Sequence, residues 1–179
     1  MFWESERLLY RHAVMSDLED LFRIYANPET NVCNPAGPHR DIQQSRNSLE
    51  KRITNTTLYG FNDWAIMTKD NPNKIIGFGG FFVSDTDGKL INNLGYRFEP
   101  NEWGKGYATE LSRRAISYGF DEVGLKDISA FLWEDNLASK RVLEKVGMRF
   151  VERSEKTDNE PTSLTFRLTY DEWLAYGGD

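Results

Sequence analysis

The sequence is poor in the residues that build metal centres, disulfide frameworks and membrane spans. Its 179 residues include one cysteine, Cys33, and two histidines, His12 and His39, which lie far apart along the chain. One thiol excludes an internal disulfide, and the spacing of these residues matches no metal-ligand pattern. No apolar run approaches the ~18 residues that span a bilayer, and the acidic, aromatic start differs from a secretory signal. These absences predict a cytoplasmic protein without a metal and without membrane association.

Clustered positive charge is missing as well. The chain has 22 Lys and Arg against 28 Asp and Glu, a net charge of -6, and no basic run longer than the pair Arg113-Arg114. Nucleic-acid binding depends on clustered cations that release counterions, so nucleic acid is disfavoured as a partner. A negative field attracts a cationic amine or a basic protein, or it only confers solubility.

What the chain does contain predicts one domain over residues 1–179. It is 39% hydrophobic and 13% aromatic, which is enough for a substantial core, and no repeat, linker or low-complexity tract divides it. Strand and helix patterns alternate, with short turn clusters between the three central strands that favour an antiparallel meander. We predict strands at 6–11, 64–67, 75–83, 90–98, 128–133, 149–153 and 164–169, and helices at 16–26, 41–54, 106–120 and 136–146.

Two helix starts carry a capping signal. Ser16 with Glu19 three residues later has the spacing of a capping box, and Asp41 is a typical N-cap residue before the second helix. Between these helices, residues 31–38 are rich in Asn, Pro and Gly and are expected to form a loop.

The clearest chemical feature is the turn at Gly104-Lys105-Gly106, between a predicted strand and a predicted helix. Its backbone N–H groups and the positive end of the helix dipole should point at one spot, which favours an anion. Glycine permits positive φ and a close approach of phosphate oxygens. A glycine turn alone is also compatible with a plain connection, but two rival nucleotide motifs fail. Thr109 stands where a dinucleotide fingerprint needs a third glycine, and Gly106 stands where a P-loop needs Ser or Thr.

Three blocks of the sequence resemble the GNAT superfamily of N-acetyltransferases, most closely its RimJ/RimL-like branch, which acetylates ribosomal-protein N-termini. The blocks are residues 5–11, residues 94–110 with Trp103-Gly104-Lys105-Gly106-Tyr107-Ala108, and residues 133–148. Residues 168–174 resemble the last strand and tail of that family. The resemblance implies an α/β (α+β) fold: a mixed, mostly antiparallel seven-stranded sheet, splayed between its fourth and fifth strands and flanked by about four helices.

The resemblance also implies acetyl-CoA as the acetyl donor and assigns residues to it. The family's phosphate loop falls on Trp103 to Ala108, where Trp103 replaces the usual Gln or Arg. Pantetheine pairing by backbone maps to the fourth strand, Asn136 matches a pantetheine-binding asparagine, and Ser139 matches a serine that can protonate the departing thiolate. Asn136 can equally be an N-cap and Ser139 a first-turn residue. The implied donor-binding residues are Tyr96, Arg97, Phe98, Gly104, Lys105, Gly106, Tyr107, Ala108, Thr109, Asn136 and Ser139.

A general base is harder to assign, because Asn93 and Phe131 occupy places where family members carry a glutamate. An α-amine with a pKa of about 7.7–8.0 loses a proton at a cost of about 1 kcal/mol at pH 7, whereas a lysine amine costs about 4.6. We therefore expect an N-terminal α-amine as the acceptor, with Glu99 or Glu134 collecting the proton through water. Two alternatives stay open: the acceptor is a small-molecule amine such as an antibiotic or polyamine, or the protein senses acetyl-CoA without catalysis. The oligomeric state, monomer or homodimer, is open as well.

Overall fold

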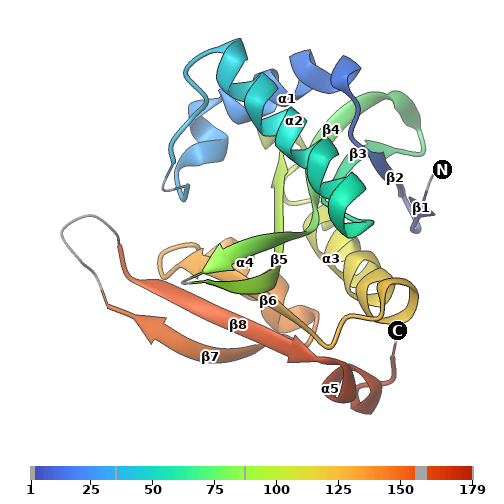
Figure 1. Cartoon of the computed structure of the whole chain (residues 1–179), viewed down its shortest axis with the longest axis vertical. Coiled ribbons are helices and arrows are strands. Elements are labelled where there is room, and N and C mark those ends of the chain that lie inside the picture. The colour runs from blue at the N-terminus through green and yellow to red at the C-terminus, as the bar shows by residue number, and fades with distance from the viewer. Residues whose placement is uncertain (1–2, 35, 87, 156–160, 179) are drawn as a thin grey trace.

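The computed structural model describes residues 3–34, 36–86, 88–155 and 161–178. They form one mixed sheet with five α-helices packed on it, and Figure 1 shows α1 and α2 at one end of the molecule and α5, β7 and β8 at the other. No helix among these residues is both long and apolar enough to cross a membrane. The strands are β1 (Trp3–Glu4), β2 (Leu8–His12), β3 (Trp64–Thr68), β4 (Asn71–Thr86), β5 (Lys89–Phe98), β6 (Asp127–Trp133), β7 (Arg149–Ser154) and β8 (Ser163–Thr169). The helices are α1 (Leu18–Tyr25), α2 (Ile42–Tyr59), α3 (Tyr107–Ser117), α4 (Leu137–Lys145) and α5 (Tyr170–Ala175).

The strand order is β1-β2-β3-β4-β5-β6-β8-β7, and every neighbouring pair is antiparallel except β5 and β6. That parallel pair meets at one register position, Asn93 opposite Ser129. Beyond Asn93 the two strands diverge, so the edge of β5 toward Phe98 is not paired with β6. The predicted α/β fold with a mixed sheet is confirmed, including the splay at these strands.

The strand count differs from the prediction because β1 adds an eighth strand. β1 has only two residues, with Trp3 opposite Tyr10 and Glu4 opposite Leu9. Two residues cannot display the alternation by which a strand is recognised in a sequence.

The helix starts show one correct and one wrong capping prediction. Asp41 caps α2 as expected, because its side chain accepts the Gln44 N–H at 2.8 Å. The capping box at Ser16 is wrong: a 3₁₀ turn precedes α1, and the Asp17 carboxylate accepts the Val14 N–H at 2.9 Å. Helix α2 also runs 18 residues, longer than predicted, because its C-terminal half lacks the apolar periodicity used to place its end.

The core consists of two apolar clusters on the two faces of the sheet. One includes Leu94 and Phe98 of β5 with Leu111 of α3, and the other includes Leu21 of α1 and Phe78 of β4. Side chains alternate along a strand, so Leu94, Tyr96 and Phe98 face α3 and the residues between them face α1 and α2. Strand β5 therefore presents two different surfaces beside the splay.

Candidate functional site

The turn before α3 has the backbone geometry that binds an anion. Gly104 and Gly106 have φ of 76° and 83°, in the left-handed region that favours glycine. The N-cap residue of α3 is Gly106, which has no side chain to cap the helix. Within the described residues, no backbone acceptor is recorded for the N–H groups from Gly104 to Thr109. These donors and the helix dipole converge on one place, although anion binding there stays a prediction.

The position of this turn is fixed by the segment between β1 and β2. The Glu110 carboxylate accepts hydrogen bonds from the Ser5 hydroxyl at 2.6 Å and from the Arg7 N–H at 2.7 Å, and it pairs with the Arg7 guanidinium at 2.8 Å. Arg7 also donates to the Lys105 carbonyl at 2.9 Å. Burial alone would raise the pKa of Glu110, but the hydrogen bonds from Ser5 and Arg7 outweigh burial and lower the pKa. We call these four residues the α3 clamp.

Side chains beside the turn are directed by local contacts. The Trp103 indole donates to the Phe98 carbonyl at 3.0 Å, which joins the turn to the end of β5. The Lys105 ammonium pairs with Glu102 at 2.8 Å, and the hydrogen bond that it donates to that carboxylate raises the pKa of Lys105. Lys105 is exposed and stays charged, so its predicted help in phosphate binding is compatible with its position.

Tyr96 brings a buried hydroxyl to the splay. Burial raises its pKa to about 12, and the Ser139 hydroxyl faces it and opposes that rise. The Tyr96 oxygen is buried without a hydrogen-bond partner among the described residues. A protonated phenol beside a serine can donate to a group that enters between them.

Asn136 is the N-cap of α4, as one of its two sequence interpretations expected. Its side-chain oxygen accepts the Ser139 N–H at 3.1 Å. No acceptor for its amide nitrogen is recorded within the described chain, so this nitrogen can also donate to a ligand. Both interpretations of Asn136 are compatible with the structure, and Ser139 lies in the first turn of α4 close to Tyr96.

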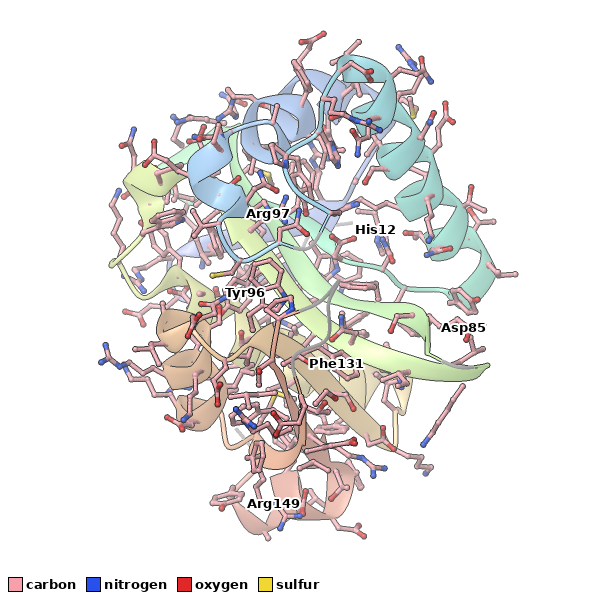
Figure 2. All side chains as sticks on the ribbon, turned by 90° about the vertical axis from the view of Figure 1, so that its left-hand side faces the viewer. His12, Asp85, Tyr96, Arg97, Phe131 and Arg149 are labelled. Carbon is pink, nitrogen blue, oxygen red and sulfur yellow. The ribbon has the colours of Figure 1, made fainter. Side chains whose placement is uncertain are left out.

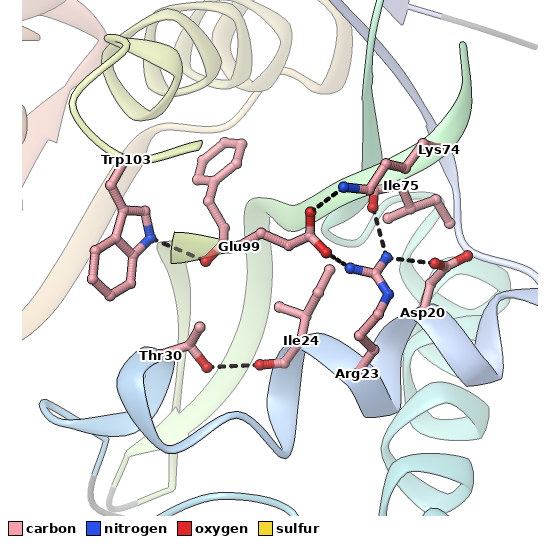
Figure 3. A network of polar contacts seen from close by, with 9 residues as sticks. Asp20, Arg23, Ile24, Thr30, Lys74, Ile75, Glu99 and Trp103 are labelled. Atoms are coloured by element: carbon pink, nitrogen blue, oxygen red, sulfur yellow. Dashed lines mark hydrogen bonds and ion pairs between the residues drawn. The ribbon is translucent and has the colours of Figure 1, made fainter. Parts of the chain in front are cut away.

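The carboxylates expected to collect a proton are both ion-paired. Figure 3 shows Glu99 between Arg23 and Lys74, with the Lys74 ammonium at 2.7 Å. Arg23 also pairs with Asp20, so Glu99 ties α1 to the sheet. Glu134 pairs with Arg153 at 3.0 Å, and this contact lowers the pKa of Glu134. Their catalytic role stays a prediction, and their contacts favour a structural role.

The two places without the family glutamate lie beside the splay. Asn93 has a buried side-chain oxygen without a partner in the described part of the chain, and Phe131 on β6 is 41% exposed. In Figure 2, Arg97 lies under the segment that joins α1 to α2, and Tyr96 and Phe131 follow further down the same view. Across the described residues, no group of His, Cys, Asp and Glu is arranged to hold a metal ion.

Two parts of this region could not be predicted from the sequence. The α3 clamp joins residues about 100 positions apart, and only the family resemblance of the 5–11 block indicated that this segment matters. The surroundings of the Arg97 side chain come from α1, α2 and the segment between them. Arg97 was predicted as a backbone contact, and no local pattern indicates where its guanidinium lies.

A family model, related sequences and solved structures all relate this chain to acetyltransferases. The model of the acetyltransferase (GNAT) domain matches residues 7–149. YkkB, an uncharacterised protein of Bacillus subtilis, is 30% identical over 166 residues, which is 93% of this chain and 95% of that protein. A GNAT-family acetyltransferase from Bacillus anthracis superposes with a TM-score of 0.80 at 26% identity, covering 96% of this chain and 99% of that one. The fold of RimL, a ribosomal alpha-N-protein acetyltransferase in complex with coenzyme A, matches with a TM-score of 0.77 at 14% identity over 96% and 99% of the two chains.

Proposed function

Because the chain belongs to the GNAT acetyltransferase family, we propose that it acetylates an N-terminal α-amine of a protein or peptide, with acetyl-CoA as the donor. One observation above all supports acetyl-CoA as the acetyl donor: the unpaired N–H groups at the start of α3 lie next to the diverging edge of β5. A diphosphate fits at such a helix start, and an extended amide chain fits along a free strand edge.

The described residues fit the parts of the donor in order. The N–H groups from Gly104 to Thr109 would receive the pyrophosphate, with Lys105 beside them. The backbone of β5 from Tyr96 to Phe98 would pair with the pantetheine arm, and the free amide nitrogen of Asn136 would donate to it. This order leads toward the hydroxyls of Tyr96 and Ser139, where the thioester would lie.

The chemistry proposed at this end is direct attack by a neutral amine on the thioester carbon. The new C–N bond forms as the C–S bond breaks, and the thiolate leaves with the bonding electrons. Ser139, with Tyr96 beside it, is the proton donor to that thiolate. A β5 backbone N–H would stabilise the negative oxygen that develops at the carbonyl, and the two hydroxyls need no ionised form to act.

The acceptor assignment rests on the four positions considered for a general base, none of which offers a free carboxylate in the described part of the chain. Glu99 and Glu134 are held by cations, and neutral side chains, Asn93 and Phe131, occupy the other two places. An α-amine can supply its neutral form at a cost of about 1 kcal/mol at pH 7, whereas a lysine side chain needs about 4.6 kcal/mol. The RimL likeness in fold is in keeping with this choice of acceptor.

The test is thiol release from acetyl-CoA with a panel of amines. The panel contains N-terminal peptides of ribosomal proteins, the same peptides with a blocked N-terminus and one free lysine, polyamines and aminoglycosides. We expect turnover with free α-amines and little with the blocked peptides. Efficient acetylation of lysine side chains alone, or of polyamines or aminoglycosides alone, would contradict the α-amine assignment. Tight acetyl-CoA binding without turnover on any amine would instead indicate a sensor.

A further inference from the structure

Two arginines and a histidine surround Tyr25 at the end of α1. The Arg97 guanidinium lies 4.2 Å above the ring centroid, the Arg52 guanidinium lies at 5.0 Å, and the His39 ring centroid lies at 5.2 Å. The Tyr25 hydroxyl accepts a hydrogen bond from Arg52 at 2.6 Å. The ring therefore fixes the directions of two guanidinium groups.

Only one of these two arginines has a carboxylate partner. Arg52 pairs with Asp63 at 3.1 Å, and both groups are largely shielded from solvent. Over the described residues, Arg97 makes no ion pair, and its one hydrogen bond goes to the neutral amide oxygen of Asn31 at 2.8 Å. The cluster thus holds one uncompensated positive charge.

The pKa shifts in the cluster agree with the lack of a carboxylate partner for Arg97 among the described residues. Burial lowers the pKa of Arg97, and the nearby Arg52 cation lowers it further, while Tyr25 opposes the change. Burial and the same two arginines lower the pKa of His39, so its ring is neutral at pH 7. A partly buried guanidinium with a single neutral acceptor has lost favourable hydration free energy. A bound anion would offset that loss.

The remaining donors of Arg97 are available to a ligand. A guanidinium has five N–H donors, and the described residues take only one of them. Nη1 donates to Asn31, and Nε and Nη2, for which the described residues provide no acceptor, are not among the fully buried nitrogen atoms that lack a partner. Figure 2 shows Arg97 on the side of the molecule that carries Tyr96 and Phe131.

Arg97 also lies next to the proposed reaction centre. It follows Tyr96 directly in β5, and it points to the α1 and α2 face while Tyr96 points toward Ser139. An acceptor that enters between the α1–α2 segment and β5 would pass the guanidinium on its way to the thioester.

We infer that the Arg97 guanidinium binds a carboxylate of the acceptor, so that the preferred substrate carries an acidic group close to its reactive amine. This inference rests on the proposed function. The planar guanidinium matches a carboxylate in a two-point contact, which Lys cannot reproduce. Acceptors with an acid beside the amine include peptides with Glu in the second or third position and free amino acids. Polyamines and aminoglycosides carry no such group.

The experiment compares acceptors that differ only in this charge. One pair is a peptide with Glu in its second position and the same peptide with Gln; a second pair is a free amino acid and its amide. For the protein as it stands, we expect kcat/KM to be about tenfold to a hundredfold higher for the acidic member of at least one pair. The peptide pair reports a side-chain carboxylate, and the amino-acid pair reports an α-carboxylate.

Three variants assign that preference to Arg97. Arg97→Gln should bring the ratio close to one, and Arg97→Lys should keep only part of it. Asn31→Asp places a carboxylate 2.8 Å from the guanidinium, so it should also abolish the preference, at the cost of the hydrogen bonds that the Asn31 amide donates to the Tyr25 and Asn27 carbonyls. Arg46→Gln removes an exposed charge on α2 and should keep the full ratio. Acetyl-CoA affinity reports whether each variant is folded.

The outcomes separate the two proposals. Turnover of both members of each pair at equal kcat/KM would overturn the inference and leave the acetyltransferase assignment intact. A preference that survives in both Arg97→Gln and Asn31→Asp would overturn it as well. No turnover with any amine would count against the proposed function itself, and the acidic-acceptor inference would fall with it.

Discussion

Replacing Gly106 by Ala probes whether the turn before α3 binds the donor through its backbone. Gly106 has φ of 83°, and a Cβ there would lie 3.4 Å from an Arg7 guanidinium nitrogen. An L-residue in the left-handed region costs about 1–2 kcal/mol. In the free protein the turn is held by two hydrogen bonds, from Arg7 to the Lys105 carbonyl and from the Trp103 indole to the Phe98 carbonyl, and neither involves Gly106 itself. We therefore expect the free turn to relieve the strain by a local shift of φ at residue 106.

Donor binding would require the turn to return to its original shape. The strain of about 1–2 kcal/mol then appears in the affinity, and it should weaken acetyl-CoA binding by about 5-fold to 30-fold. Isothermal titration calorimetry measures this change directly. The matched control is Gly124→Ala, because Gly124 has φ of 75°, has open space around its Cβ position, and ends the π-helical turn after α3. That variant should lose stability and keep its acetyl-CoA affinity. Equal acetyl-CoA affinities for the two variants would show that the turn before α3 does not bind the donor through its backbone.

Three further predictions concern the site and its supports. Ser139→Ala should lower kcat, measured by thiol release, by up to about a hundredfold, with a smaller change in acetyl-CoA affinity. An unchanged kcat in Ser139→Ala and in the double variant with Tyr96→Phe would exclude these hydroxyls as proton donors. Glu99→Gln leaves Arg23 and Lys74 without their shared anion, so it should lower the melting temperature by about 2–4 °C, which corresponds to about 1 kcal/mol. A melting temperature equal to that of the parent protein would show that the ion pairs of Glu99 do not hold α1 on the sheet. The pKa of Glu110 is lowered on folding, so its contribution to stability is complete above pH 4.5 and disappears as the pH falls below that value. The difference in unfolding free energy between the parent protein and Glu110→Gln should therefore shrink in acid, and a difference that grows in acid would contradict the α3 clamp.

Local sequence signals predicted the features that depend on local contacts. The turn at Gly104 and Gly106 lies between a strand and a helix, as expected. It was predictable because glycine permits positive φ whatever its distant neighbours are. The start of α2 at Asp41 follows from a cap whose donor is three residues away. The capping box at Ser16 failed because Asp17, one residue later, captured the free N–H of Val14 and also pairs with Arg11.

The features that define the site's chemistry depend on distant pairs. Glu99 was a plausible proton acceptor in the sequence, but its cations come from α1 and β4, and no local pattern connects them. The same is true of Arg97, whose environment is supplied by Tyr25, Asn31 and Arg52. Motifs thus supply candidate residues for a site, whereas the partners of those residues depend on packing.

We propose that this chain moves an acetyl group from acetyl-CoA to an α-amine. Mass spectrometry of a peptide with one free α-amine and one lysine, after incubation with the protein and acetyl-CoA, tests this transfer directly. We expect the mass of one acetyl group added at the N-terminus, stoichiometric release of thiol, and strong reduction of both in Ser139→Ala. Acetylation confined to the lysine side chain, or thiol release without any acetylated peptide, would contradict it.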